Sequence, residues 1–220
     1  QRPDEIVALA RSLGAGRLSA TDYADAVNRY IQSNIDIELR FGLSKGALGA
    51  IVDQSGTPFD QAHLMVELLR EGNVAASYKV GSVTMTANQF GRWSGLVKPT
   101  AADTANLISA FTVDARAACE ILADGGIPAS IGSTSGCAST SGNLSTISFG
   151  HIWVSANGRQ YDPSFKSHDL WRQDTALVTT ICGGTDCSVA LTDAIQSGAS
   201  ISSNYLQSPN LNSLIQSMKT

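Results

Sequence analysis

His151 and Asp162 are the residues whose types and spacing in this sequence best suit catalytic chemistry. Between them lies Asn157-Gly158, the preferred turn of a two-residue β-hairpin. A hairpin that turns there would set two strands side by side and bring the imidazole to the carboxylate. A histidine oriented by an aspartate is the general-base part of a nucleophilic triad. A triad also needs a nucleophile from elsewhere in the chain.

The element expected to position such a nucleophile is a helix over about residues 58–71. Thr57 is a good N-cap, Pro58 suits the first helical position, and Asp60 completes an arrangement like a capping box. Apolar residues cover most of the circumference of this helix, which predicts that it is largely buried. A narrow polar strip through Asp60 and His63 is expected to face solvent.

Hydrophobic periodicity predicts the other elements, as helices where the apolar spacing is helical and as strands where it alternates. The other expected helices span about 4–13, 22–33 and 104–124. The expected strands span 76–86, 147–156 and 159–163. A short strand and a helical turn are expected within 36–52, and irregular structure at 87–103 and 130–146. A central buried helix followed by several strands is an α+β pattern.

Three sequence blocks follow one another in a fixed order. They are GTPFDQAHLMVELLREG (56–72), which leads into ASYKVG (76–81), then GHIWVSANG (150–158), then QYDPSFK (160–166). Over about residues 20–170 the chain thereby resembles the transglutaminase-like superfamily. The resemblance is closest to a subgroup found near the front of large secreted YD-repeat (Rhs-type) bacterial proteins. It implies a papain-like α+β fold, in which a central buried helix packs on an antiparallel β-sheet, with extra N-terminal helices.

The resemblance also assigns roles to individual residues. The family's cysteine lies at a helix N-terminus, where free N–H groups and the helix dipole stabilise its thiolate for attack on an amide. His151 and Asp162 match the family's histidine and aspartate, but Pro58 occupies the position of the cysteine. Proline has no nucleophile, so the match implies a dyad left without its thiol. The residues expected at the cleft of this site are Asp60, Gln61 and Trp153.

The four cysteines of the chain lie elsewhere in the sequence. Cys182 and Cys187 flank a turn-forming Gly-Gly-Thr-Asp stretch, which favours a disulfide between them and leaves Cys119 and Cys137 free or paired. A zinc site is the weaker alternative, because no second short-spaced Cys/His pair accompanies the first. Of the four, only Cys137, in a loop ahead of His151, is a candidate for a relocated nucleophile, and this is the less favoured alternative.

The composition is that of a globular protein, with 43% hydrophobic and 15% charged residues among 220. The formal net charge is −4 and lysines and arginines do not cluster, which argues against binding of nucleic acid or an anionic membrane surface. No apolar run reaches the roughly 18–20 residues that cross a bilayer, so no membrane insertion is expected. The abundance of small polar residues, together with the expected disulfide, favours a secreted or cell-surface bacterial protein.

Residues 1–20 are expected to form a helical preface, 21–187 the core, and 188–220 a tail that is either a linker or a packing helix. The expected function is a non-catalytic binding, scaffolding or docking module of a larger secreted protein. Its partner would be a peptide, a protein surface or another domain of the same polypeptide. The alternative is an active cysteine peptidase, amidase or transamidase, resembling a toxin or effector, that uses Cys137. No metal or other cofactor is expected, because the histidines and Asp162 match no zinc-binding spacing.

Overall fold

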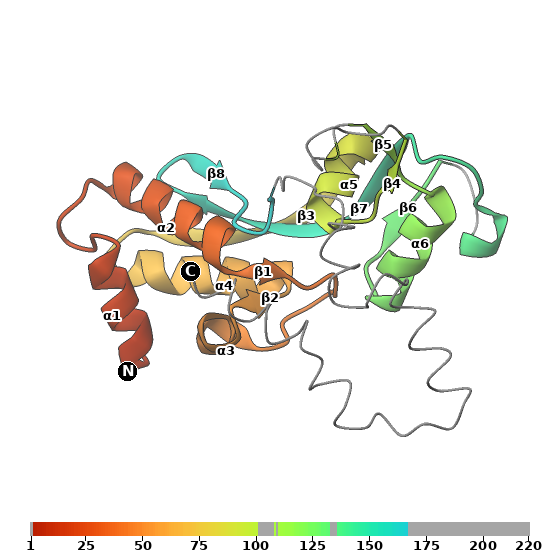
Figure 1. Cartoon of the computed structure of the whole chain (residues 1–220). Coiled ribbons are helices and arrows are strands. Elements are labelled where there is room, and N and C mark those ends of the chain that lie inside the picture. Colours follow the sequence, from red (N-terminus) through yellow and green to blue (C-terminus); the bar gives the residue numbers. More distant parts are fainter. Residues whose placement is uncertain (1, 101–107, 109, 133–135, 167–220) are drawn as a thin grey trace, which may run out of the picture. The chain divides into compact units, whose positions relative to one another are not determined.

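The computed structural model describes residues 2–100, 108, 110–132 and 136–166, and the structural statements below concern these residues. Apart from Ile108, they belong to one compact unit of the chain. In this unit helices pack on an antiparallel sheet, so the α+β class predicted from the sequence is confirmed (Figure 1). The expected Cys182–Cys187 disulfide and the expected tail lie outside the described residues.

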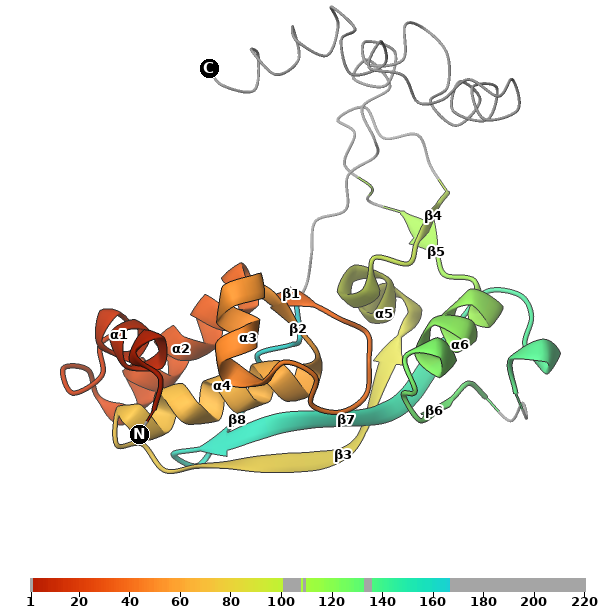
Figure 2. The same cartoon turned by 90° about the horizontal axis from the view of Figure 1, so that it is seen from below.

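Four helices occupy the N-terminal part of the chain. They are α1 (Asp4–Ser12), α2 (Ala20–Asn34), α3 (Gly46–Asp53) and α4 (Pro58–Glu71). The other three pack on α4, which also lies along the sheet (Figure 2). Its apolar side chains from Ala62 to Leu69 are fully buried. The predicted buried central helix is therefore confirmed, with both ends as expected.

The cap of α4 explains why this helix begins so sharply. The Thr57 hydroxyl accepts a hydrogen bond from the Asp60 N–H (3.1 Å), and the Asp60 carboxylate accepts one from the Thr57 N–H (3.0 Å). This reciprocal pair is the predicted capping box, with Pro58 at the first helical position. The predicted polar strip is confirmed at His63, which is partly exposed, but it is wrong at Asp60, which is fully buried.

The sheet is organised around one long central strand, β7 (Thr146–Ala156). Strand β3 (Ala76–Thr86) runs antiparallel along one side of β7 for its whole length. On the other side, β6 (Ala129–Ser130) and β8 (Arg159–Tyr161) pair with opposite ends of β7. Asn157 and Gly158 join β7 to β8 with positive φ angles of 49° and 74°, so the predicted hairpin turn is confirmed. Two short ladders complete the strands: β1 (Asp36–Ile37) with β2 (Ser55–Gly56), and β4 (Lys98–Pro99) with β5 (Phe111–Thr112).

Two expectations about the middle of the chain are wrong. Residues 87–103 were expected to be irregular, but they contain α5 (Ala87–Ser94), which has its own capping box between Thr86 and Gln89. The helix expected over 104–124 is confirmed only as α6 (Ala115–Asp124), capped by Asp114, because residues 111–112 form β5. The capping box that starts α5 and the Asp114 cap that starts α6 are local signals that the hydrophobic periodicity does not include. A side chain at Gly91 would clash with Phe111 and Val113, so α5 packs closely against the β5 region.

Two clusters of buried hydrophobic side chains meet along β7. The residues of β7 in the first cluster, around α4, are Ile152, Val154 and Ala156. Those in the second cluster, with α5 and α6, are Ile147 and Phe149. Because successive side chains of a strand point to opposite faces, the buried set changes phase between Phe149 and Ile152. His151 lies between these two residues, and its side chain points to the same face of the strand as that of Phe149. It is 1% exposed.

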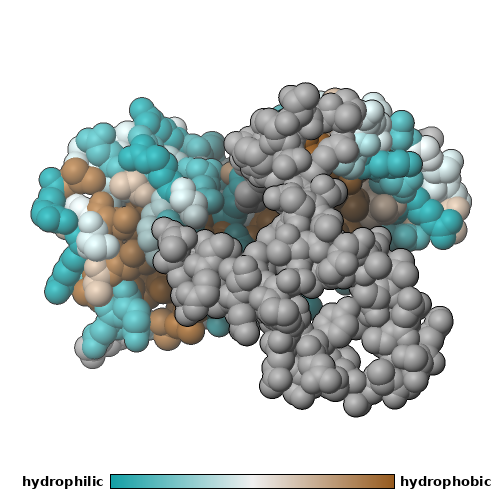
Figure 3. Space-filling model, viewed as in Figure 1, coloured by the Kyte–Doolittle hydropathy of each residue, from teal (hydrophilic) through white to brown (hydrophobic). Residues whose placement is uncertain are grey.

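Helix α3 also carries apolar side chains that face solvent. Leu48 is 37% exposed and Val52 69% exposed, although Ala47 and Ala50 of the same helix are buried. In Figure 3, hydrophobic side chains lie among hydrophilic ones over α1, α3 and α4. Helix α3 is therefore apolar on more of its circumference than its contact with α4 requires.

Candidate functional site

The hairpin brings His151 and Asp162 together, as the sequence predicted. His151 lies in the middle of β7, and Asp162 follows the last residue of β8. Since Val154 pairs with Tyr161, the chain after β8 continues back along β7 toward His151. Nε2 of His151 lies 2.7 Å from Oδ2 of Asp162. The geometry is that of an imidazole held in place by a carboxylate.

The carboxylate of Asp162 is itself fixed by the chain that follows it. Its Oδ1 accepts hydrogen bonds from the Ser164 N–H (3.1 Å), the Ser164 hydroxyl (2.8 Å) and the Phe165 N–H (3.1 Å). This turn leaves Oδ2 for His151. The dyad is therefore rigid on its aspartate side.

Aromatic rings enclose the imidazole of His151. The centroid of the Trp93 ring lies 6.1 Å away and that of Phe149 5.7 Å away, both in an edge-on arrangement. The Trp93 indole N–H donates to the carbonyl oxygen of Ser164 (2.9 Å), which ties α5 to the turn that holds Asp162. Trp93 is thus a positioning residue for the dyad. No sequence signal pointed to Trp93, since it lies in a stretch without clear periodicity.

Ser164 lies close to the dyad but does not complete a triad. Its Oγ is 3.4 Å from Nε2 of His151, the same nitrogen that contacts Asp162. In a triad the base uses one ring nitrogen for the nucleophile and the other for the orienting carboxylate. The Ser164 hydroxyl instead donates to Asp162 and is fully buried. No described residue forms a hydrogen bond with Nδ1 of His151.

A cavity of about 330 Å³ opens beside Asp162. Its lining residues are Ser82, Val83, Trp153, Gln160, Tyr161 and Asp162. The indole N–H of Trp153, a residue expected at the cleft, donates to Oε1 of Gln160 (2.9 Å). The ring lies over Gly81, where a Cβ atom would come within 2.9 Å of it. A side chain at this point of β3 would therefore collide with the Trp153 ring.

The other residues expected at the site lie at the start of α4. No hydrogen bond or ion pair within the described residues joins Pro58, Asp60 or Gln61 to His151 or Asp162. The Gln61 side chain is buried, and its amide N–H donates to backbone oxygens of β1 and β2. Its role in the structure is to fasten this small ladder to α4.

Asp60 is bound by the backbone of the loop before α3. Oδ1 accepts hydrogen bonds from the N–H groups of Ser44 (3.0 Å), Lys45 (2.8 Å) and Gly46 (2.7 Å), and Oδ2 accepts one from Thr57. Burial by itself would raise the pKa of Asp60, but these four backbone N–H groups outweigh it and lower the pKa below the ordinary value. Its oxygens are occupied, so Asp60 is not free to orient a water for catalysis.

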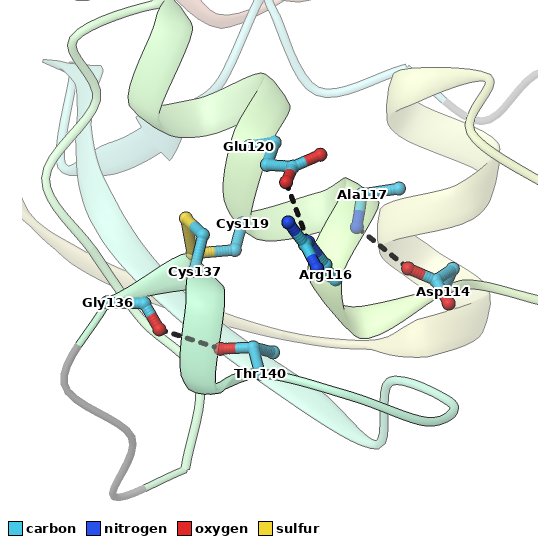
Figure 4. The surroundings of a disulfide bond; sticks show 8 residues. All are labelled: Asp114, Arg116, Ala117, Cys119, Glu120, Gly136, Cys137 and Thr140. Carbon is cyan, nitrogen blue, oxygen red and sulfur yellow. Dashed lines mark hydrogen bonds and ion pairs between the residues drawn. A yellow bond between two sulfur atoms is a disulfide. The ribbon is translucent and has the colours of Figure 1, made fainter.

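Cys137 is joined to Cys119 by a disulfide. Cys119 lies on α6, and Cys137 begins a short 3₁₀ helix, Cys137–Ser139 (Figure 4). Of the two states left open for this pair by the sequence, the structure has the paired one. A disulfide sulfur is not a thiolate, so Cys137 in this form has no nucleophile to offer. The described part of the chain contains no other cysteine.

Lys166 is a buried cation next to the dyad turn. Its ammonium donates to the carbonyl oxygens of Ile31 (2.9 Å), Gln32 (3.3 Å) and Pro163 (3.3 Å), and so covers the C-terminus of α2. Burial lowers the pKa of Lys166 to about 8, although the negative charges of Asp36 and Asp162 oppose this shift.

We expect Lys166 to make the free energy of unfolding change with pH in the alkaline range. Between pH 8 and the ordinary value of 10.5, the unfolded chain holds a proton on this lysine that the folded chain has released. The free energy of unfolding therefore rises with pH in this window, by on the order of 2 kcal/mol up to pH 10. Urea unfolding of the wild type and of Lys166→Met at pH 7.5 and 9.5 measures this. Parallel changes in the two proteins would contradict the prediction.

The described residues contain no group of three or more histidine, cysteine, aspartate or glutamate side chains that could hold a metal ion. Within the same residues, no helix has both the length and the hydropathy to span a membrane. The chain matches no protein-family model, no curated protein and no solved structure.

Proposed function

We propose that this chain is a transglutaminase-like module that has lost catalysis and binds a peptide or protein segment within a larger secreted bacterial protein. The observation that carries the proposal is a complete histidine–aspartate dyad without a thiol. Pro58 occupies the position at which the resemblance expects the cysteine, and Cys137 is held in a disulfide. His151 is enclosed by aromatic rings and 1% exposed, as suits a structural pair.

The arrangement of elements supports the transglutaminase-like part of the proposal. A capped and buried helix packs on an antiparallel sheet, with the histidine on β7 and the aspartate directly after the neighbouring strand β8, in the expected order. Pro58, at the position that the resemblance gives to the cysteine, is the first residue of helix α4, so this position lies at a helix N-terminus as the resemblance expects.

Two further features support a secreted binding role. The Cys119–Cys137 disulfide is typical of an oxidising compartment. The cavity beside Asp162 has an aromatic wall, Trp153, together with the polar Gln160. Aromatic and amide side chains at an open cavity are common in sites that hold a peptide.

The rival function is a cysteine peptidase, amidase or transamidase with a relocated nucleophile, and thiol labelling separates the two. Purified, non-reduced protein is treated with iodoacetamide at mildly acidic pH, and modified cysteines are located by mass spectrometry. A catalytic thiolate of low pKa reacts under these conditions, whereas a disulfide does not. We expect no modification of any of the four cysteines, and modification of Cys119 and Cys137 after unfolding and reduction.

The opposite result has an equally clear form. Rapid labelling of Cys137, or of either cysteine outside the described residues, that a glutaminyl peptide protects would overturn the proposal and establish the enzyme. A Cys137→Ser variant then shows whether that cysteine is the reactive one.

A further inference from the structure

Among the strands that the structure describes, β3 is an edge strand of the sheet. It pairs with β7 along one side, and no described strand pairs with the other side. Tyr78, Val80, Ser82 and Thr84 are exposed, and Val80 is 64% exposed. An exposed edge strand offers unpaired backbone groups to another chain. Lys79 is the one charged residue of β3, so little on this strand deters such pairing.

Two contacts identify which backbone groups of β3 point outward. In an antiparallel ladder the N–H and C=O of one residue point to the same side, and the side alternates along the strand. The N–H of Gly150 donates to Pro128 next to β6 (2.7 Å), so Gly150 does not exchange hydrogen bonds with its partner Ser82. Ala87, an odd-numbered residue directly after β3, instead donates its N–H to the carbonyl oxygen of Ser145 across the β3–β7 ladder (2.9 Å). Odd-numbered residues therefore point their backbone groups toward β7.

The outward residues of β3 are therefore those of even number. They are Tyr78, Val80, Ser82 and Thr84. Their backbone N–H and C=O groups point away from β7, and none of them has a hydrogen-bond partner within the described residues. Together they present a row of donors and acceptors along 78–84, which is the requirement for adding one more strand.

One face of this edge opens on an apolar cavity of about 290 Å³. Its lining residues are Leu43, Phe59, His63, Tyr78 and Ile152. Val80 pairs with Ile152 across the ladder, so its side chain stands on the same face as the cavity. The Tyr78 hydroxyl lies 2.8 Å from Nδ1 of His63, which fixes one wall. A large apolar side chain on an added strand would enter this cavity from beside Tyr78 and Val80.

The opposite face of the edge carries a positive charge. Lys79 is exposed and makes no ion pair with a described residue, and in the β3–β7 register it lies across from Trp153. Neighbouring side chains of an added strand alternate between the two faces. An acidic residue next to the apolar one would therefore stand near Lys79, where opposite charges on adjacent strands attract.

We propose that the outer edge of β3 binds an extended peptide as an additional strand, with a large apolar side chain in the Tyr78 cavity and an acidic neighbour beside Lys79. This inference rests on the proposed binding function and names its partner chemistry. The backbone ladder supplies the affinity, and the cavity and the charge select the sequence. The partner is a peptide segment of alternating apolar and acidic residues.

The experiment uses the synthetic peptide acetyl-Thr-Leu-Glu-Val-Glu-Leu-Thr-amide with a fluorescent label, titrated with the whole chain and followed by anisotropy. We expect saturable binding, with amide shifts in β3 in an NMR titration. Two versions of the peptide carry N-methyl groups on alternate residues, one set on each parity. We expect one version to lose binding and the other to keep it, because only one parity of N–H groups faces β3.

Three protein variants test the three features separately. Ser82→Pro removes an outward N–H that the β7 ladder does not use, and we expect binding to weaken by about fivefold or more. Leu43→Ala shortens the cavity wall and is expected to weaken binding of this peptide. Lys79→Glu is expected to weaken binding of the acidic peptide and to strengthen binding of the same peptide with lysine in place of glutamate. Far-ultraviolet circular dichroism confirms that each variant is folded.

Several outcomes would overturn the inference. These are no saturable binding, equal binding of both N-methylated peptides, or unchanged binding by Ser82→Pro. A concentration-dependent dimer that Ser82→Pro abolishes would also overturn it, because a second copy of the chain would then occupy the edge. Binding of the peptide by a protein that proves catalytically active would refute the proposed loss of catalysis and leave this inference standing. Absence of both binding and catalysis would refute this inference alone.

Discussion

Replacing Asp60 by asparagine is expected to lower the free energy of unfolding by about 3–5 kcal/mol. The carboxylate is fully buried and accepts four backbone hydrogen bonds, from Ser44, Lys45, Gly46 and Thr57. An asparagine has nearly the same shape, but its amide group would place donors against donors at one of the two oxygen positions. The hydrogen bonds that join the loop before α3 to the start of α4 would be weakened. Urea unfolding followed by circular dichroism measures the loss.

Gln89→Ala is the matched control, because Gln89 holds the equivalent position in the exposed capping box of α5. We expect it to cost about 1 kcal/mol or less. We also expect the contribution of Asp60 to the free energy of unfolding to change at acidic pH. Its pKa is lowered in the folded protein, so its contribution is present above the ordinary value of 3.8 and is lost as the pH falls below that value. A loss for Asp60→Asn no greater than that for Gln89→Ala would contradict this view of the α4 cap.

Trp93→Ala is expected to have the second large effect, a loss of about 3–5 kcal/mol in the free energy of unfolding. The indole is 1% exposed, stacks on Phe149 with centroids 5.1 Å apart, and donates its N–H to the carbonyl of Ser164. Truncation would remove the aromatic cover of His151 and leave a large void in the second hydrophobic cluster.

One further variant separates packing from hydrogen bonding at Trp93, and a second serves as a control at another tryptophan. Trp93→Phe keeps a ring against Phe149 but leaves the Ser164 carbonyl unpaired, and we expect a loss of about 1–3 kcal/mol. Trp153→Ala removes a partly exposed indole and is expected to cost less than Trp93→Ala. Chemical denaturation of the three variants ranks them. Equal losses for Trp93→Ala and Trp153→Ala would contradict the expectation that the buried Trp93 contributes more to stability than the partly exposed Trp153.

Local signals in the sequence predicted the elements that carry the dyad. The capping box at Thr57 and the turn at Asn157-Gly158 depend on contacts between residues a few positions apart, so both can be recognised without tertiary structure. The turn then brings His151 and Asp162 together, because register follows from a short loop.

Contacts between distant segments were not predictable in the same way. The burial of Asp60 depends on a loop that folds over it from 14–16 residues earlier, and the helical pattern alone placed it on a solvent-exposed strip. Trp93 acquires its role from Ser164, 71 residues away. The pairing of Cys119 with Cys137 joins α6 to a loop, and the cysteine spacing alone left it open. Such contacts have no period along the chain, so no sequence pattern identifies them.

In the proposed function, the histidine–aspartate dyad works with no nucleophile. The most direct measurement is ammonia release from glutaminyl peptides, with and without a primary amine, by the purified chain and by a folded His151→Ala variant. Mass spectrometry of the peptides detects cleavage in the same samples. We expect no release and no cleavage above the protein-free blank for either protein. Release or cleavage by the wild type that His151→Ala abolishes would refute the proposed loss of catalysis.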